Sequence, residues 1–145
     1  MKILLLTMLI AYSLNYNAAN ALAYAKKWWN SYNPKYYNYN KSGGDCANFV
    51  SQCLIAGGQS LSGCSTDKKG CVPGVSNLKK CLTKKKWKSS KSVPKGFKAG
   101  YPVIFSGHAT IASSVKGKKV LVACHSKAHY DSPTSWYGTP VYYYL

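Results

Sequence analysis

The run GGDCANFVSQCLIAGG, residues 43–58, constrains the fold more than any other part of this 145-residue chain. The apolar side chains in it recur with helical spacing, which places them on one face of a helix. The residues on this face are Cys46, Phe49, Val50, Cys53 and Leu54. Asp45 is a favoured N-cap residue and Gly57-Gly58 supplies a C-terminal stop, so the run predicts a helix packed against the core.

The remaining segments predict two more helices followed by strands. Helical spacing marks residues 17–31 and 75–87. Beyond Val93 the chain consists of short β-rich runs separated by Gly, Lys and Pro turns. These runs are residues 101–107, 108–115, 118–126 and 139–145, with a hairpin tip at 116–119. The order predicts an α+β fold in which N-terminal helices pack on a small antiparallel β-sheet.

The first 13 residues are typical of a secretory signal peptide. Lys2 precedes an apolar run from Ile3 to Tyr12, and the segment ends in an A-x-S pattern at Ser13. A buried N-terminal strand or helix is the alternative. We expect a single domain over residues 14–145 that is secreted, or held in the lumen of a secretory or phagocytic/lysosomal compartment. No later run is apolar enough to cross a bilayer.

The charge is strongly one-sided. The chain has 20 lysines, no arginine and three acids (Asp45, Asp67 and Asp131), giving a formal net charge of +17. Such a surface attracts anionic surfaces and polymers, although the alternative is simply a solvated, soluble surface. Arginine is the commonest bidentate reader of guanine and phosphate, so its absence argues against specific nucleic-acid binding.

Six cysteines in an oxidising compartment are expected to form disulfides. Cys64 with Cys71 is the natural pair within one loop, and Cys53 with Cys81 would join two helices. The sequence alone leaves this connectivity open. No C-x-x-C pair is present, so we expect no metal site.

Cys46 stands at the start of the predicted helix, where free N–H groups and the helix dipole lower a thiol pKa and can bind an oxyanion. The alternative role is half of a disulfide. His108 and His125 flank the predicted hairpin at 116–119, and a bulge or modest stagger would bring them side by side. The three residues form a candidate Cys–His–X arrangement, in which a base is oriented by a second polar group. We expect little from His129, which lies in a polar loop.

These motifs resemble the putative amidase family, a branch of the NlpC-type papain-like cysteine peptidases. DCANFVSQ at 45–52 is similar to its D-C-[ST]-N-F-V-S-Q motif, and YNAANALAYA with the later NPKY is similar to its opening helix. SGHATI resembles its G-H-x-x-I segment and ACHS its closing H-[ST] pair. The resemblance spans roughly residues 16–126. The sequence departs from the family pattern at Ala47, at Tyr101 and in the KAHYD segment.

The resemblance implies a papain-like core and a Cys-His-His triad. In it Cys46 is the nucleophile, His108 the general base and His125 the orienting third member. It also implies that Tyr36 stands at the cleft near the oxyanion hole, where we place Asp45 as well.

We therefore expect a secreted cysteine amidohydrolase or peptidase, most simply one that cleaves amide bonds in bacterial peptidoglycan through an acyl-enzyme. Such chemistry requires no cofactor, and we expect a monomer whose partner is the bacterial cell wall. The main alternative is a non-catalytic cationic antimicrobial or envelope-binding protein. A third is an acyl-transferring enzyme on the same scaffold. The sequence leaves open which amide bond is cleaved and the source organism.

Overall fold

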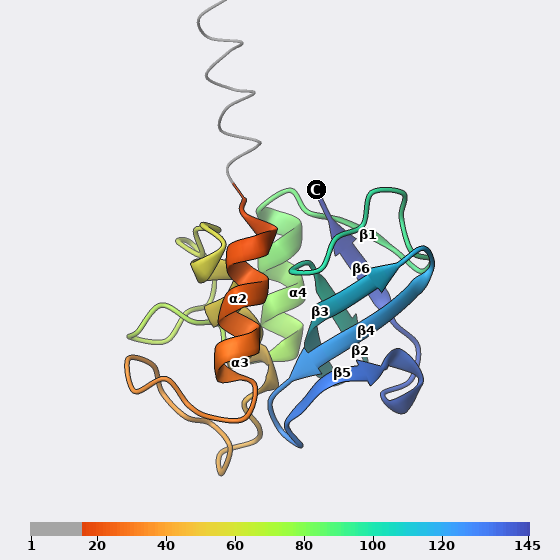
Figure 1. Ribbon diagram of the computed structural model, residues 1–145. Helices are drawn as coiled ribbons and strands as arrows, with labels where there is room; N and C mark the ends of the chain where they lie inside the picture. Colours follow the sequence, from red (N-terminus) through yellow and green to blue (C-terminus); the bar gives the residue numbers. More distant parts are fainter. Residues whose placement is uncertain (1–15) are drawn as a thin grey trace, which may run out of the picture.

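The helices come first in the chain and the strands follow them, as the computed structural model in Figure 1 shows. The structure describes residues 16–145, so the predicted signal peptide over residues 1–13 lies outside the described residues. The helices are α2 (Ala18–Trp28), α3 (Cys46–Ala56) and α4 (Val75–Lys84), with a 3₁₀ helix η1 (Thr134–Trp136) near the end. The strands are β1 (Lys88–Ser90), β2 (Pro102–Phe105), β3 (His108–Lys116), β4 (Lys119–Cys124), β5 (His129–Pro133) and β6 (Val141–Tyr144).

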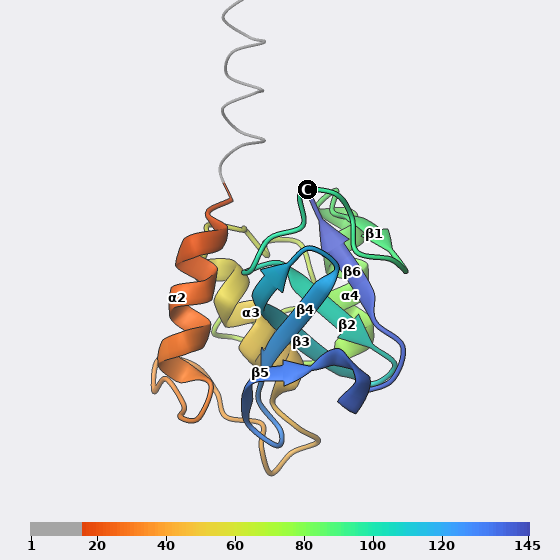
Figure 2. The same cartoon turned by 45° about the vertical axis from the view of Figure 1, so that its right-hand side comes forward.

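The strands form one antiparallel sheet in the order β1-β6-β2-β3-β4-β5. Strands β2 to β5 make a meander, and β6 returns to pair with the free edge of β2. Helices α2 and α3 pack side by side against the β3–β4 part of the sheet, and α4 lies next to α3 (Figure 2). The predicted α+β class and the antiparallel sheet are confirmed, as is the hairpin tip, where Lys116 pairs with Lys119.

Helix α3 is the centre of the molecule, because every residue from Cys46 to Leu54 is buried. Its polar side chains are buried with it and hold neighbouring segments. Ser51 Oγ exchanges hydrogen bonds with the backbone of Val72, and Gln52 Oε1 accepts from Tyr24 Oη on α2. Buried polar groups need such partners to offset the loss of water. The DCANFVSQ motif is therefore a core helix whose polar residues fix the surrounding loops.

Two edge strands, β1 and β5, are absent from the sequence expectations. Strand β1 is three exposed or half-exposed residues, and β5 lies in the segment read as a polar loop. Edge strands are paired on one side only, so their sequences need little of the apolar alternation that marks a buried strand. In β5, Asp131 has a φ of +55° and Pro133 ends the strand, which hides its β character further.

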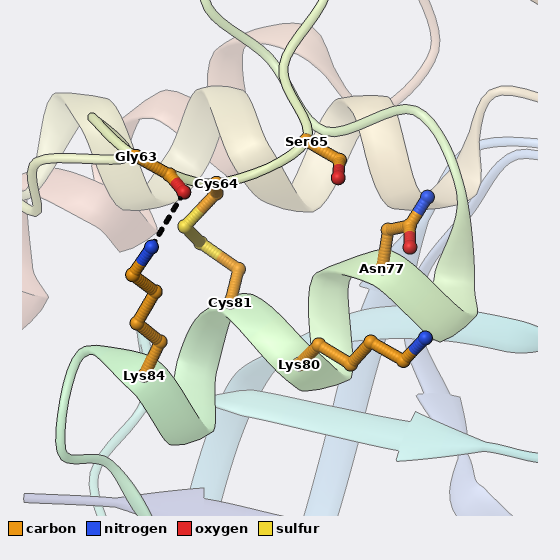
Figure 3. Close-up of a pocket in the computed structure, with 7 residues that line it drawn as sticks. All are labelled: Gly63, Cys64, Ser65, Asn77, Lys80, Cys81 and Lys84. Carbon is orange, nitrogen blue, oxygen red and sulfur yellow. Dashed lines mark hydrogen bonds between the residues drawn. A yellow bond between two sulfur atoms is a disulfide. The ribbon is translucent and has the colours of Figure 1, made fainter.

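The disulfide pairing expected from the sequence is wrong. Cys64 is bonded to Cys81, which joins the loop after α3 to helix α4 across 17 residues (Figure 3). Cys53 and Cys71 are both buried as free thiols. Cys53 is fully enclosed on the core face of α3, so it packs as a small apolar side chain and does not face α4's cysteine.

None of the helices in residues 16–145 has both the length and the hydropathy needed to span a bilayer.

Candidate active site

Cys46 is the first residue of α3, and it is buried, with 8% of its surface exposed. Burial raises the pKa of this thiol above its ordinary value, and the neighbouring Asp45 carboxylate raises it further. Backbone amides of Ala109, Ala47 and Cys46 itself act in the opposite direction without overcoming burial. The expected lowering of the Cys46 pKa is therefore wrong, and at neutral pH the group is a protonated thiol.

His108 begins β3, one residue before the Ala109 amide that acts on the Cys46 thiol. Its ring stacks on Tyr137, with centroids 4.9 Å apart, and its Nε2 atom is buried without a hydrogen-bond partner among the described residues. Burial, followed by the charge of His129, lowers the pKa of His108 below its ordinary value. At neutral pH the ring is therefore an uncharged imidazole whose Nε2 is free to take a proton.

The sheet register does not bring His108 and His125 side by side. A β-bulge near Ser113 shifts the β3–β4 pairing, and beyond it Ile111 lies opposite Ala123. The recorded ladder ends there, and His125 lies beyond the end of β4 at Cys124, so no pairing of His108 with His125 is recorded in the described structure. The predicted bulge exists.

Both ring nitrogens of His125 are occupied by other groups. Nδ1 lies 2.6 Å from Asp45 Oδ2 and Nε2 lies 2.7 Å from the backbone oxygen of Trp28, at the end of α2. The ring is 2% exposed and stacks on Phe49 at 4.1 Å. A carboxylate and a carbonyl oxygen only accept hydrogen bonds, so each ring nitrogen of His125 faces an acceptor. The contact with Asp45 is a buried salt bridge.

Asp45 occupies the N-cap position of α3, yet its side chain does not cap the helix. Its Oδ1 accepts from the backbone N–H of Tyr39 at 2.8 Å and from Asn48 Nδ2 at 2.9 Å. Its own backbone N–H donates to Ser126 Oγ at 2.6 Å. Both oxygens of the carboxylate are engaged by these donors and by His125, so Asp45 holds together the segments around the start of α3. The expectation that Asp45 stands at the cleft stays a prediction.

Gly44 makes this junction possible. It has a φ of +105°, and a Cβ atom there would lie 3.0 Å from Ser126 Oγ. A side chain would therefore be strained by the backbone and would press on the hydroxyl that holds Asp45. The positive φ and this close approach explain why a residue without a side chain, Gly44, precedes Asp45 and Cys46.

Tyr36 lies apart from the Cys46 thiol in the contacts that the structure records. The Tyr36 ring is half-buried, and Lys35 Nζ lies 5.7 Å from the ring centroid. The phenol of Tyr36 raises the pKa of Tyr24, and Cys71 contributes to raising the pKa of Tyr36 itself. These neighbours place it over the loop beside the middle of α3. The expectation that Tyr36 contributes to an oxyanion hole stays a prediction.

Two residues near the site, Tyr137 and Cys124, were not anticipated, and His129 was expected to contribute little. Tyr137 stacks on His108, and its hydroxyl contacts Ser132 Oγ at 2.7 Å and the Cys124 thiol at 3.5 Å. Cys124 lies close enough to Cys46 for that group to raise its pKa. His129 lowers the pKa of His108, as described above. The aromatic pair in TSWYG was the sequence signal for Tyr137, whereas nothing local marked Cys124.

No group of three His, Cys, Asp or Glu side chains within residues 16–145 is arranged to hold a metal ion.

Comparisons with known proteins identify a relative and a family. A stretch of 48 residues is 46% identical to the uncharacterized protein YhbB of Bacillus subtilis (strain 168), covering 33% of this chain. The match spans 14% of that relative's own length. No solved structure matches the chain. The family model described as "Putative amidase domain" matches residues 15–99, which contain Cys46 and end before β2. That match extends over more than half of the sequence, and the chain belongs to this amidase-domain family.

Proposed function

We propose that this protein is a secreted cysteine amidohydrolase with Cys46 as the nucleophile and His108 as the general base. The observation that carries the proposal is a thiol at the start of α3, within reach of the Ala109 amide of β3, together with the buried and unpartnered Nε2 of His108, the residue before Ala109. A buried ring nitrogen without a partner is costly in a structural role, because it loses its hydrogen bond to water. A substrate-dependent proton transfer gives that nitrogen a use.

The reaction begins with a neutral thiol and a neutral imidazole. As the substrate carbonyl arrives, His108 Nε2 takes the thiol proton and the sulfur forms a bond to the carbonyl carbon. The protonated His108 gives this proton to the leaving amine as the carbon–nitrogen bond breaks, which leaves a thioester on Cys46. A water molecule then loses a proton to His108 and attacks the thioester. The carboxylic acid product leaves, and the sulfur recovers its proton.

The start of α3 supplies stabilisation for the oxyanion of both steps. The first N–H groups of a helix have no partner within it and lie at the positive end of its dipole. Cys46 and Ala47 occupy these positions, so their amides are suited to a developing negative charge near the sulfur. His125 takes a positioning role in this scheme, since it holds Asp45 and thereby the first turn of α3.

The substrate we propose is an amide bond of bacterial peptidoglycan. The support is the amidase-domain family, a leading segment typical of secretion, and a cationic chain suited to an anionic envelope. A helix carrying the nucleophile at its N-terminus, packed on an antiparallel sheet carrying the histidine, is also the arrangement of a papain-like core. This relationship is part of the proposal.

A non-catalytic envelope-binding protein is the competing function, and the net charge of +17 favours it. Under that alternative, binding and killing of bacteria depend on lysines and are unaffected by a change at Cys46. The envelope-binding alternative does not explain why the buried Nε2 of His108 lacks a partner.

The test is mass spectrometry of soluble fragments released from purified peptidoglycan. The wild-type protein is compared with Cys46→Ala and His108→Ala, and with Cys124→Ala and His129→Ala as matched controls that change the same residue types nearby. We expect both site variants to lose release by at least two orders of magnitude, typical of a lost nucleophile or base. The controls retain release within about tenfold, allowing for their contacts with the site.

Release by Cys46→Ala at the wild-type rate would overturn the proposal. If Cys46→Ala is inactive while His108→Ala is unaffected, the nucleophile stands and the base is assigned wrongly. Addition of an amine to the reaction separates hydrolysis from acyl transfer, since a transferase would form the new amide in preference to the acid.

A further inference from the structure

The third member of a Cys–His–X site orients the ring of the base, and His125 does not do so in this structure. Its Nδ1 atom lies against Asp45 Oδ2 and its Nε2 atom against the Trp28 carbonyl, so neither nitrogen is left for His108. The buried Nε2 of His108 has no hydrogen-bond partner among the described residues. An imidazole that takes a proton from one direction needs a fixed orientation. Another contact is therefore needed to hold the His108 ring.

Aromatic packing supplies this contact. Tyr137 stacks on His108, with ring centroids 4.9 Å apart and planes inclined by 27°. Phe105, which lies opposite His108 on β2, has its centroid 6.4 Å from the imidazole and 5.4 Å from the Tyr137 ring. A near-parallel stack opposes rotation of the imidazole. The negative face of the Tyr137 ring also favours a positively charged partner, which His108 becomes during each proton transfer.

The Tyr137 ring is itself fixed through its hydroxyl group. Ser132 is 3% exposed and donates its one hydroxyl proton to the Val122 carbonyl at 3.1 Å. Tyr137 is therefore the donor in the 2.7 Å contact between Tyr137 Oη and Ser132 Oγ. The Cys124 thiol donates to the same Tyr137 oxygen at 3.5 Å. Burial raises the pKa of Tyr137 to about 12, so the phenol keeps its proton at neutral pH.

The groups that fix Tyr137 belong to the sheet. Ser132 lies opposite Val122 in the β5–β4 pairing, and Cys124 is the last residue of β4. Tyr137 follows directly after η1, and its backbone N–H donates to the Thr134 carbonyl at 3.1 Å. The chain thus leaves β5, makes one short turn and returns Tyr137 to the start of β3.

We propose that Tyr137 is the positioning residue of the base, and that it holds the imidazole of His108 by stacking where a hydrogen-bonding third member would otherwise orient it. The inference rests on the proposed function for the role of His108, and it adds the residue that fixes this ring. Tyr137 exchanges no proton with the substrate and acts through His108. Loss of its ring should therefore slow the chemical step and leave substrate binding unchanged.

The first measurement separates kcat from KM, with soluble peptidoglycan fragments as substrate. Tyr137→Leu removes the aromatic ring, and Tyr137→Phe keeps the ring without the hydroxyl. The matched control is Tyr130→Leu, because Tyr130 is also half-buried but its recorded ring partner is Trp29. We expect Tyr137→Leu to lower kcat about 100-fold with KM within about threefold of the parent, as for a misplaced catalytic group. Tyr137→Phe should lose only about three- to tenfold in kcat, and Tyr130→Leu should match the parent within about threefold.

The second measurement requires no catalysis. Nitrogen-15 NMR of the three histidines, in a Cys46→Ala background, reports which ring nitrogen carries the proton in the neutral form. His108→Ala assigns the His108 signals. The parent should show one His108 tautomer, with Nε2 unprotonated, and Tyr137→Phe should keep it. Tyr137→Leu should show averaged nitrogen shifts, because a released ring reaches water with both nitrogens.

Ser132→Ala tests the hydroxyl contact and carries the test if Tyr137→Leu does not fold. It leaves Tyr137 Oη without its acceptor, so kcat should fall about three- to tenfold with KM unchanged. Tyr137→Phe/Ser132→Ala should lose no more than either single variant, since both break the same hydrogen bond. Additive losses, or no loss in either single variant, would contradict the contact.

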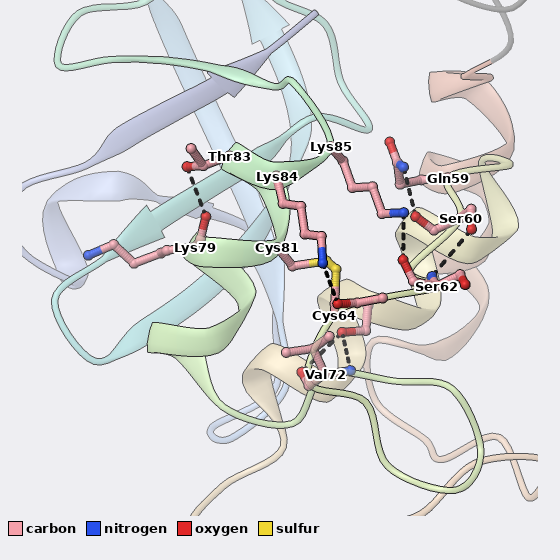
Figure 4. The surroundings of a disulfide bond; sticks show 12 residues. Gln59, Ser60, Ser62, Cys64, Val72, Lys79, Cys81, Thr83, Lys84 and Lys85 are labelled. Atoms are coloured by element: carbon pink, nitrogen blue, oxygen red, sulfur yellow. Dashed lines mark hydrogen bonds between the residues drawn. A yellow bond between two sulfur atoms is a disulfide. The ribbon is translucent and has the colours of Figure 1, made fainter.

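The Cys64→Ser/Cys81→Ser variant is the control for a general loss of stability. Figure 4 shows this disulfide between the loop after α3 and helix α4, and the side chains drawn around it include neither His108 nor Tyr137. Removing the cross-link weakens the fold and leaves the stack on His108 in place. At a temperature at which this variant is folded, its kcat and its His108 tautomer should match the parent.

Parental kcat and a single tautomer in folded Tyr137→Leu would overturn the inference. An equal fall in kcat in Tyr130→Leu or in the disulfide variant would trace the effect to stability and would overturn it as well. A parent that releases no fragments refutes the proposed hydrolase, and the NMR measurement alone then decides whether Tyr137 holds His108. An active parent with unaffected Tyr137 variants refutes the positioning role and leaves the hydrolase in place.

Discussion

Replacing Asp45 by Asn tests the buried ion pair at the start of α3. The amide keeps the size of the side chain and an oxygen for the Tyr39 and Asn48 donors, but it removes the charge opposite His125. His125 is 2% exposed and Asp45 is fully buried, so solvent does not screen the loss. Breaking one side of such a pair costs about 3–5 kcal/mol, since a buried charge is left without its partner.

That loss is large compared with the free energy of unfolding of a typical domain, which is about 5–15 kcal/mol. At roughly 4 °C per kcal/mol for a domain of this size, the thermal midpoint should fall by ~12–20 °C. Circular dichroism and urea titration measure it. Asp131→Asn is the control, because that carboxylate is exposed and bonds to Ser113 Oγ; its change should stay within about 0.5 kcal/mol.

A double-mutant cycle makes the reasoning refutable. If Asp45 and His125 act as one unit, Asp45→Asn/His125→Gln loses about as much stability as either single variant. Additive losses, or a single-variant loss below about 1 kcal/mol, would show that the pair contributes no coupling. A second readout is chemical: the Asp45 carboxylate raises the pKa of Cys46, so the folded Asp45→Asn protein should be alkylated faster at neutral pH.

Three further predictions follow from the geometry of other sites. The pKa of His108 is lowered by burial and by His129, so the base form persists as pH falls below the usual histidine value of about 6.5. The acid limb of kcat/KM should lie below that pH, and His129→Gln should move it upward. Replacing the Cys64–Cys81 disulfide by two serines should cost about 3 kcal/mol in urea unfolding, from the 17-residue separation it closes. Gly100→Ala should cost more than about 2 kcal/mol in the same assay, because a Cβ there would lie 2.1 Å from a backbone oxygen of α2 and its φ is +98°.

Controls separate these effects from general damage. Gly43→Ala has a similar positive φ of +96° but open space around the Cβ, so it should lose only the backbone part of the Gly100 effect. Equal losses at the two glycines would contradict the crowding at α2. An acid limb at or above the ordinary histidine range, or a disulfide variant as stable as the parent, would contradict the other two.

The sequence was sufficient for elements whose own side chains determine their structure. Helix α3 was predictable because an apolar face, an N-cap residue and a glycine stop coincide within one run. The β3–β4 hairpin was predictable because Lys-Gly-Lys-Lys separates two β-rich segments. In both cases local preference and tertiary packing agree. Cys46 and His108, singled out from the sequence, lie at the α3–β3 junction.

The parts that escaped prediction depend on partners far away in the chain. Cys81 pairs with Cys64 because the loop after α3 crosses α4, a path that no local pattern encodes. His125 contacts Asp45, which is 80 residues away in the chain, and no local pattern encodes that contact. The pKa of Cys46 rises because burial outweighs the helix amides, and the extent of burial is known only once the fold is assembled.

The placement of the three carboxylates has a consequence for acid environments. Proteins commonly unfold in acid because many paired carboxylates become protonated, and their net charge rises steeply as they do. Here three aspartates exist against a formal charge of +17, so acidification changes the surface very little. Adhesion to anionic material should be nearly constant from neutral to acidic pH.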